Sequence, residues 1–346
     1  MTSNVGFVAI GRNEGERAIT CVKSALRDAA DPSAVIYVDS GSTDGSPEQI
    51  ASLGVTVVDL DTSAGFTAAR ARNAGLEKLR ELHPDIAFVQ FLDGDCELVE
   101  GWVATALDSL NADDKLAGVA GRRRERFPDQ TVYNQLCDME WNTPTGPADA
   151  VGGDAMFRVA SLAEVDAYDP TMIAGEEPEM CIRLRVRGWT LARLDAEMTM
   201  HDAAMTRMKQ WWSRNKRAGH AYAETLDRHP PTGRKEVRSN WLLGLFGPIF
   251  VGVVSAAAIV IALLGDVTVA LVTVGVWLVL MTLYTGFQMM VRRRIVKYRQ
   301  SRGDDAKHAN TYATWVLRGK LPQAMGQLKY RLNKARGKRS GIIEYK

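Results

Sequence analysis

The stretch Ile86–Leu92, with the sequence IAFVQFL, leads directly into Asp93-Gly94-Asp95 and decides the fold. A short, nearly uninterrupted apolar run of this kind predicts a strand that is buried on both faces. Apolar runs of the same type precede it at Val5–Ile10, Ala34–Asp39 and Val55–Asp59, and helix-like stretches separate the runs at Glu14–Ala29, Pro47–Leu53 and Thr67–Leu82. This alternation predicts an α/β domain around a mostly parallel sheet.

Polar residues gather where these predicted strands end. Gly11–Glu14 follow the first strand, Asp39–Ser42 the second and Asp93–Asp95 the fourth. Such residues also serve as ordinary turns and helix caps. Open α/β sheets bind ligands at the carboxyl ends of their strands. The repetition of these polar residues along one edge therefore favours a binding site there.

Asp93-Gly94-Asp95 is a candidate metal-binding motif. Two carboxylates on either side of a glycine can hold a hard divalent cation, which in turn binds a diphosphate. The cation stabilises the negative charge that develops on phosphate oxygen when a nucleoside diphosphate leaves a sugar. The triplet is also common in turns, so it does not identify a function by itself.

Four motifs together resemble family 2 glycosyltransferases. They are Val8–Glu14 (VAIGRNE), Val38–Ser46 (VDSGSTDGS), Ala71–Gly75 (ARNAG) and Leu92–Asp95 (LDGD). The resemblance covers roughly residues 4–220 and implies a GT-A fold, an inverting mechanism and a nucleotide-sugar donor, with a UDP-sugar favoured. The implied nucleotide-sugar pocket is lined by Gly11, Glu14, Asp39, Arg72, Asp93 and Asp154.

Within that pocket the resemblance implies that Asp39 reads the base and that Arg72 and Asp93 border the nucleoside. The simpler alternatives are a cap for Asp39 and a salt bridge for Arg72. Asp154 ends the stretch Gly152-Gly153-Asp154, which in the family lines the acceptor side of the donor sugar. A sugar hydroxyl contact and a capped turn are both open for it.

The metal site implied by the resemblance contains Asp95 and His201, with Mn²⁺ or Mg²⁺ as the ion. His201 resembles a downstream histidine that completes the metal site in some relatives, and the alternative is a contact to Asp95 itself. The four cysteines, Cys21, Cys96, Cys137 and Cys181, show no metal-ligand spacing and are expected to be free packing thiols.

The catalytic base is expected in Gly175-Glu176-Glu177-Pro178-Glu179. An inverting transfer needs a carboxylate that removes the proton of the acceptor hydroxyl. The segment resembles the Glu-Asp pair of the family, which points to Glu177, but the replacement of Asp by Glu keeps Glu176 open as the base. The acidic residues also suit the first turn of a helix.

Two nearly uncharged stretches, Trp241–Gly265 and Val267–Met290, are each long enough to cross a bilayer. Only Gly265-Asp266 separates them, so we expect a transmembrane helical hairpin rather than a buried soluble one. Basic residues flank both outer ends: Arg234, Lys235 and Arg238 before, and Arg292, Arg293, Arg294, Lys297 and Arg299 after. The positive-inside rule then predicts an inner-membrane protein with its catalytic domain and both termini in the cytoplasm, in agreement with the lack of a signal-peptide pattern.

Charge is distributed unevenly along the chain. Residues 1–200 carry a net charge of −15 and residues 291–346 a net charge of +13. Basic amphipathic helices are expected at Met205–Tyr222, and in the tail around Leu317, Leu321, Met325, Leu328 and Leu332. Next to transmembrane spans, such helices favour anionic membrane lipid as the partner over nucleic acid.

The sequence thus predicts four parts: a catalytic domain (1–204), an interfacial segment (205–240), a hairpin (241–290) and a basic cytoplasmic tail (291–346). The expected function is metal-dependent, inverting sugar transfer to a lipid or lipid-linked acceptor, in glycolipid or cell-surface polysaccharide synthesis. Alternatives are a polyprenol-phosphate sugar transferase, a nucleotidyltransferase and a catalytically idle membrane scaffold. Gly11–Arg17 lacks the Gly-rich loop with Lys that nucleotidyl transfer usually needs.

Overall fold

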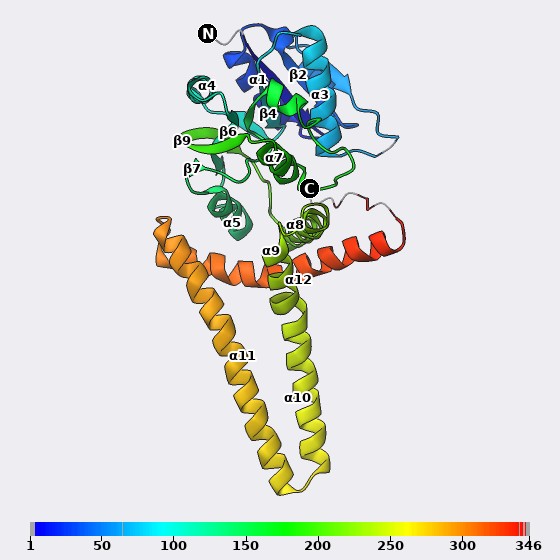
Figure 1. Cartoon of the computed structure of the whole chain (residues 1–346), viewed down its shortest axis with the longest axis vertical. Coiled ribbons are helices and arrows are strands. Elements are labelled where there is room, and N and C mark those ends of the chain that lie inside the picture. The colour runs from blue at the N-terminus through cyan, green and yellow to red at the C-terminus, as the bar shows by residue number, and fades with distance from the viewer. Residues whose placement is uncertain (1–3, 64, 339, 342, 344–346) are drawn as a thin grey trace. The chain divides into compact units, whose positions relative to one another are not determined.

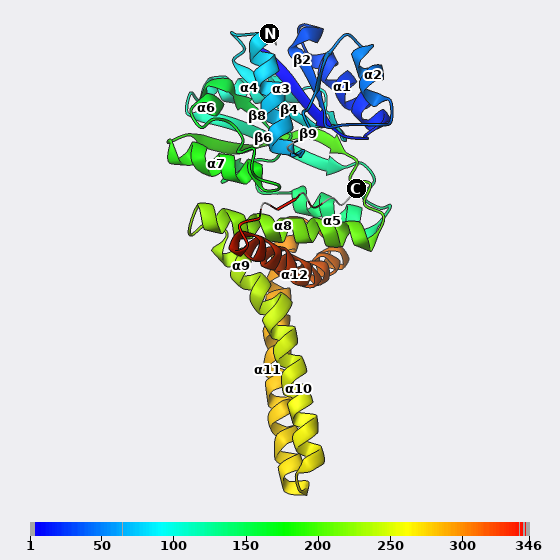
Figure 2. The same ribbon diagram turned by 90° about the vertical axis from the view of Figure 1, so that its right-hand side faces the viewer.

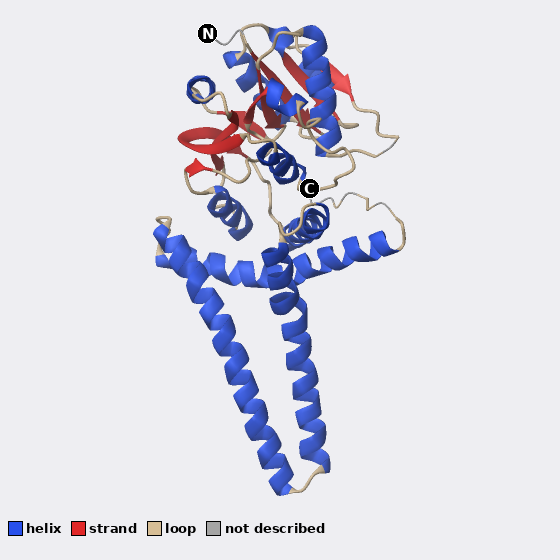
Figure 3. Cartoon of the chain, in the orientation of Figure 1, coloured by secondary structure: helices blue, strands red, loops and turns tan. Residues whose placement is uncertain are grey.

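The computed structural model describes residues 4–63, 65–338, 340, 341 and 343. The chain divides into two compact units. We call Met1–Met208 the sheet unit and Lys209–Arg339 the helical unit; the residues after Arg339 are divided between them. In Figure 3 every strand belongs to the sheet unit.

The sheet unit is built on one mixed sheet with the order β3-β2-β1-β4-β8-β6-β9-β5, and β7 pairs with β9. Neighbours from β3 to β4 are parallel, as are β6 and β9, whereas the other pairs are antiparallel. The strands are β1 (Val5–Gly11), β2 (Val35–Asp39), β3 (Thr56–Asp59), β4 (Phe88–Asp93), β5 (Cys96–Leu98), β6 (Leu116–Glu125), β7 (Gly146–Pro147), β8 (Met156–Arg158) and β9 (Thr190–His201). The expected α/β fold is confirmed, but the sheet is mixed rather than mostly parallel, because β8, β5 and β7 pair antiparallel with their neighbours and only β3-β2-β1-β4 and the pair β6–β9 are parallel.

Three of the four predicted strands, β1, β2 and β4, are buried because helices cover both faces of this part of the sheet, whereas the edge strand β3 is partly exposed. Successive side chains of β1 point to opposite faces, and both Phe7 and Val8 are fully buried. On the face of Val8, α3 approaches so closely that a methyl group at Gly75 would overlap the Val8 side chain. Figure 1 shows β2 and β4 between α1 and α3.

The helices of the sheet unit agree with the predicted ones where predictions were made. Thr67 caps α3, since its hydroxyl accepts a hydrogen bond from the Arg70 amide at 3.2 Å. The elements are α1 (Glu16–Asp28), the 3₁₀ turn η1 (Pro32–Ala34), α2 (Ser46–Ala51), α3 (Ala68–Leu82), α4 (Trp102–Ala112), α5 (Val132–Trp141), α6 (Val159–Ala163) and α7 (Glu176–Val186).

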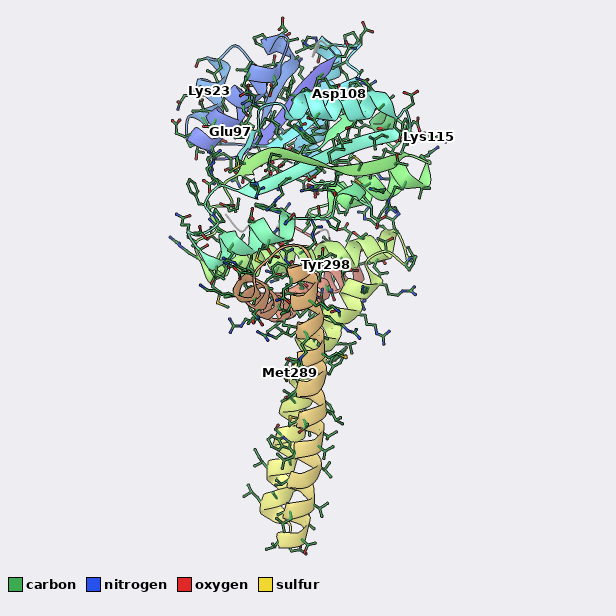
Figure 4. The ribbon with its side chains drawn as sticks, turned by 90° about the vertical axis from the view of Figure 1, so that its left-hand side faces the viewer. Lys23, Glu97, Asp108, Lys115, Met289 and Tyr298 are labelled. Carbon is green, nitrogen blue, oxygen red and sulfur yellow. The ribbon has the colours of Figure 1, made fainter. Side chains whose placement is uncertain are left out.

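Within its described residues, the helical unit holds two helices long and apolar enough to span a membrane, Arg234–Leu264 and Val267–Ser301, whose most apolar 18-residue stretches have mean hydropathies of 2.5 and 2.2. Asp266 lies in the turn between them and caps the second helix, because its carboxylate accepts a hydrogen bond from the Val269 amide at 3.0 Å. In Figure 4, Met289 and Tyr298 project from the second helix, and both are about half exposed. The elements are α8 (Met208–Arg228), α9 (Arg234–Asn240), the π-helical turn η2 (Trp241–Phe246), α10 (Gly247–Leu264), α11 (Val267–Ser301) and α12 (Ala306–Ala335).

Two helices have other bounds than the predicted segments that they contain. α11 continues past Met290 through the basic run to Ser301, and the point where the second span leaves the membrane stays a prediction. Arg and Lys are good helix formers, so the helix can outlast its apolar part. The first amphipathic helix begins at Met208, and Met205 lies ahead of it as a buried residue.

Helices α8 and α12 pack directly on each other, as Figure 2 shows. Trp211 of α8 meets Trp315 of α12 edge to face, with ring centroids 4.8 Å apart. A methyl group at Gly219 or at Gly326 would overlap the backbone of the opposite helix. The face of α8 that carries Trp211 is therefore covered by protein, and contact of the rest of the helix with the headgroup layer stays a prediction.

Candidate functional site

The candidate site of the sheet unit begins at the carboxyl ends of β1, β2 and β4. These three strands are neighbours in the sheet, and Gly11 is in register with Asp39, as Ile10 is with Asp93. The middle glycine of Asp93-Gly94-Asp95 has a packing reason: a methyl group on Gly94 would lie 3.0 Å from the Ile10 carbonyl oxygen. The Gly94 amide donates a hydrogen bond to that oxygen at 2.8 Å.

The loops after β1 and β2 are tied together by side chains. Asn13, in a left-handed conformation with φ of 54°, accepts a hydrogen bond from the Thr43 amide at 2.7 Å and donates its own amide to Ser42 Oγ at 2.8 Å. The Gly15 amide donates to Asp44 at 2.8 Å. This bonding fixes the shape of the edge on which the predicted nucleotide-binding residues lie.

Asp39 is buried at this edge and serves its own loop. Its carboxylate accepts hydrogen bonds from the amides of Gly41 and Ser42, each at 2.8 Å, and from the Ser42 hydroxyl. These bonds are the capping alternative considered from the sequence, and contact with a nucleotide base stays a prediction. Glu14 is paired with Arg17 at 2.6 Å.

Arg72 is the central cation of the site. It projects from α3, is almost fully buried, and makes ion pairs of 2.8 Å to Asp93, 3.0 Å to Glu176 and 3.2 Å to Glu177. A methyl group at Gly153 would overlap the guanidinium and lie 3.1 Å from Glu177 Oε1, so this glycine makes room for the pair. Arg72 donates a hydrogen bond to Glu176, which lies 104 positions away in the sequence.

The two candidate bases differ in environment although they are adjacent. Both open α7 behind Gly175, whose φ of 79° is a left-handed conformation suited to glycine. The side chain of Glu176 is 4% exposed and that of Glu177 is 20% exposed. Burial, and then the like charge of Glu176, raise the pKa of Glu177 to about 7 against the opposing effect of Arg72.

Asp93 lies between two guanidinium groups. Arg72 contacts one carboxylate oxygen at 2.8 Å and Arg123 the other at 3.1 Å. Burial by itself would raise the pKa of Asp93, but these two cations outweigh it and hold the pKa below its usual range. The carboxylate therefore stays ionised in the site.

Arg123 is a site residue that the sequence reasoning missed. It comes from β6 and also binds Asp154, with Nε 2.6 Å from Oδ2. Asp154 is 0% exposed and further accepts hydrogen bonds from Thr199 at 2.8 Å and from Cys96 at 3.4 Å. The partners of Asp154 are thus protein groups, and its predicted contact to a sugar hydroxyl stays a prediction.

Asp95 and His201, the predicted metal pair, meet at the end of β9, with His201 Nε2 3.2 Å from Asp95 Oδ1. The opposite ring nitrogen faces Glu125, 3.8 Å from Oε2. Burial alone would lower the pKa of His201, yet the carboxylate of Asp95 raises it overall. Oxygen and nitrogen donors at this spacing fit a divalent cation, and Asp95, Cys96 and His201 offer ligand atoms that all lie within 4.8 Å of one another.

Trp141, at the end of α5, closes this part of the site. Its ring lies edge to face with His201, centroids 4.5 Å apart, and the Arg123 guanidinium is 5.3 Å from its centroid. A strand-by-strand reading of residues 116–125 could have found Arg123, because alternate residues of a strand share a face. Nothing local in the sequence indicates Trp141.

Comparison with known proteins adds the following. The model of glycosyl transferase family 2 matches residues 9–163. A similar solved structure is the mannosyltransferase PcManGT from Pyrobaculum calidifontis in complex with GDP-Man and Mn²⁺, which is 20% identical, has a TM-score of 0.52 and aligns over 91% of this chain and 86% of that one. TarS from S. aureus is 15% identical with a TM-score of 0.46 over 68% of this chain and 45% of its own. No curated protein sequence matches the chain.

Proposed function

We propose that this chain, whose residues 9–163 match the model of glycosyl transferase family 2, transfers a sugar, with inversion, from a nucleotide-sugar donor to a lipid or lipid-linked acceptor at the cytoplasmic face of a membrane. A UDP-sugar is the proposed donor. The product would enter glycolipid or cell-surface polysaccharide synthesis.

The observation that carries the proposal is the position of Arg72 between Asp93 and the glutamate pair. Asp93 belongs to the edge where strand ends bind ligands, and Glu177 is the more exposed of the two glutamates. The Arg72 guanidinium thus links Asp93, on the proposed donor side, to Glu177, on the proposed acceptor side. A donor and an acceptor bound on the two sides would bring their reacting atoms together.

Glu177 is the proposed base. A carboxylate that removes a hydroxyl proton works best when its pKa is near the working pH, and burial together with Glu176 raises the pKa of Glu177 to about 7. The Glu177 carboxylate would take the acceptor proton as the oxygen attacks the anomeric carbon opposite the leaving diphosphate. Arg72 would hold the base in place and keep its pKa from rising further.

Asp95 and His201 are the residues proposed to hold Mn²⁺ or Mg²⁺. When bound, such a cation stabilises the negative charge on the departing diphosphate. The similar mannosyltransferase structure is described with Mn²⁺ and GDP-Man. Glu125, facing the far nitrogen of the His201 ring, would fix the orientation of the ring.

The helical unit supports the proposal of a membrane-linked acceptor. The two candidate spans bury none of their most apolar residues inside the protein, which is the behaviour of helices that contact lipid. Basic residues flank both outer ends, and α12 leaves an apolar row exposed at Leu321, Met325, Leu328 and Leu332. We propose that this row contacts the headgroup layer of an anionic membrane.

The substitution Glu177→Gln tests the proposal, because it keeps the size of the side chain and removes the base. Turnover is expected to fall by about 10²–10⁴-fold while donor affinity is retained. The matched control is Glu179→Gln in the same helical turn, where Glu179 pairs with Arg183 at 2.7 Å instead of Arg72. Donor affinity is measured by thermal stabilisation with UDP-, GDP- and dTDP-sugars in the presence of Mn²⁺.

Loss of donor binding in Glu177→Gln would remove the base assignment. Full turnover would do the same and would favour an acceptor that is already anionic, such as a polyprenol phosphate. Metal-dependent hydrolysis of the donor without acceptor separates an enzyme from an idle scaffold.

A further inference from the structure

Cys96 points into the candidate metal centre. It opens β5 and is the direct cross-strand partner of His201 in the antiparallel pair β5–β9, and side chains directly opposite on such strands share one face. Its sulfur lies 3.7 Å from Asp95 Oδ1. Asp95, Cys96 and His201 are all buried.

Two of the three distances between these ligand atoms are close to the edges of a tetrahedral site, and the third pair lies within 4.8 Å. Zinc binds carboxylate oxygen at about 2.1 Å, imidazole nitrogen at about 2.05 Å and thiolate sulfur at about 2.3 Å, which places oxygen about 3.4 Å from nitrogen and about 3.6 Å from sulfur. The corresponding distances here are 3.2 Å from Asp95 Oδ1 to His201 Nε2 and 3.7 Å from Asp95 Oδ1 to Cys96 Sγ. A cation could therefore bind the three groups with small movements.

Cys96 also belongs to a second group, with Asp93 and Asp154. Those two carboxylates already share a cation, because Arg123 pairs with both of them. The carboxylates of this second group are thus already balanced by a protein cation, so a metal ion is expected on the Asp95–His201 side.

We propose that Asp95, Cys96 and His201 form a site for a thiophilic divalent cation such as Zn²⁺, which displaces the hard cation used in transfer and so inhibits the enzyme. On binding, the Cys96 S–H bond breaks, a sulfur–metal bond forms, and the proton leaves to solvent. The inhibition rests on the proposed function, whereas metal binding is independent of it.

The same three residues then treat hard and soft cations differently. The Cys96 sulfur lies beside the Asp95–His201 pair, 3.7 Å from Asp95 Oδ1, so it is placed to join the ligands of a thiophilic metal. Mn²⁺ and Mg²⁺ prefer oxygen ligands, whereas Zn²⁺ binds thiolate strongly enough to release the proton. A hard cation would use Asp95 and His201, and a soft one would use all three residues.

Cobalt is the probe for this proposal, since Co²⁺ occupies zinc sites and its bond to thiolate absorbs in the near ultraviolet. The metal-free full-length chain in detergent is titrated with Co²⁺, and Zn²⁺ affinity is measured by calorimetry. The wild type is expected to show the thiolate band, Cys96→Ser to lose it and to bind Zn²⁺ at least about tenfold more weakly. The matched control Cys137→Ser, which changes another buried free cysteine, is expected to keep both.

A wild type without the band, or a Cys96→Ser variant that retains it, would overturn the proposal. Thermal stabilisation of Cys96→Ser by Mn²⁺ shows that the variant is folded and that its hard-cation site is intact. In the transfer assay with Mn²⁺, Zn²⁺ should inhibit Cys96→Ser at least about tenfold less effectively than wild type. An inactive wild type would contradict the proposed function, while the cobalt spectrum would still report on the site.

Discussion

The sheet unit buries charged side chains, whereas the helical unit exposes apolar ones. In the sheet unit Arg72 and Asp154 are almost completely buried, each held by opposite charges. In the helical unit side chains such as Leu278, 53% exposed, cover the outside of α10 and α11. Buried charges are tolerated where they are paired, and large exposed apolar surfaces mark contact with something other than water. We therefore expect the helical unit to contact lipid and the sheet unit to contact water.

The largest effect is expected from charge placed on the apolar surface of the helical unit. Val276→Arg combined with Leu278→Arg puts two cations near the middle of the uncharged part of α11, Val267–Met290, at about 2.5–3.5 kcal/mol each for insertion, or ~5–7 kcal/mol together. The chain should shift from the carbonate-resistant membrane fraction to the extractable one.

Val186→Arg is the control from the sheet unit. Val186 is 80% exposed at the end of α7, and a charge in water costs almost nothing, so membrane retention should be unchanged. If the α11 double variant stays as resistant to extraction as wild type, the assignment of lipid as the solvent of α11 is wrong.

The next largest effect concerns the buried charge of the sheet unit. Arg72→Met leaves Asp93, Glu176 and Glu177 without their shared cation and is expected to cost about 3–5 kcal/mol of the free energy of unfolding. Arg124→Met is the matched control, because the pair Arg124–Glu197 is 49% and 44% exposed and should contribute about 0–1 kcal/mol. Denaturant titration measures both, and equal losses would contradict the distinction between buried and exposed pairs.

The sequence predicts the parallel part of the sheet well, and the reason is local. Apolar runs such as Ile86–Leu92 need both faces covered, so the short length of the run and its apolar residues indicate β4 (Phe88–Asp93). The order of the motifs also predicts that Arg72, Asp93 and Glu177 lie in one site. Their ion pairs confirm that the three residues are neighbours. Their catalytic roles stay predictions.

What the sequence could not supply is register between distant strands. Arg123 is the middle of three consecutive arginines, and only the pleat of β6 directs it toward Asp154, while Arg122 pairs with Asp138 and Arg124 with Glu197. The contact of Cys96 with the metal pair depends on the β5–β9 register in the same way.

The helical unit shows a related limit. The period of α8 reveals that an apolar face exists but does not reveal what covers it. In the structure Trp211 packs on Trp315, so another helix covers part of a face that a membrane was expected to cover. Two amphipathic helices of one chain can cover each other's apolar faces, just as a headgroup layer can cover them.

A smaller effect is expected at Gly153, where the buried charges touch the backbone. Gly153→Ala places a methyl group against the Arg72 guanidinium and should cost about 1–3 kcal/mol, with a lower turnover because Glu177 loses its position. At the neighbouring Gly152 a methyl group meets nothing within 4 Å, so Gly152→Ala should lie within about 0.5 kcal/mol of wild type. A Gly153→Ala variant with normal stability and turnover would show that Arg72 does not need its present position.

The smallest effect is expected from pH, and it tests whether the buried charge of the sheet unit does chemistry. A base with a pKa raised to about 7 is protonated and inactive below that pH and ionised above it. Turnover at saturating Mn²⁺ should therefore fall about fivefold from pH ~7 to pH ~6. In Glu176→Gln the like charge that raises the pKa of Glu177 is removed, so the midpoint of the profile should move to lower pH. A surface substitution such as Glu197→Gln should leave the midpoint in place. If the midpoint stays unchanged in Glu176→Gln, the titrating group is not Glu177, and the pairing of these two glutamates around Arg72 is structural rather than catalytic.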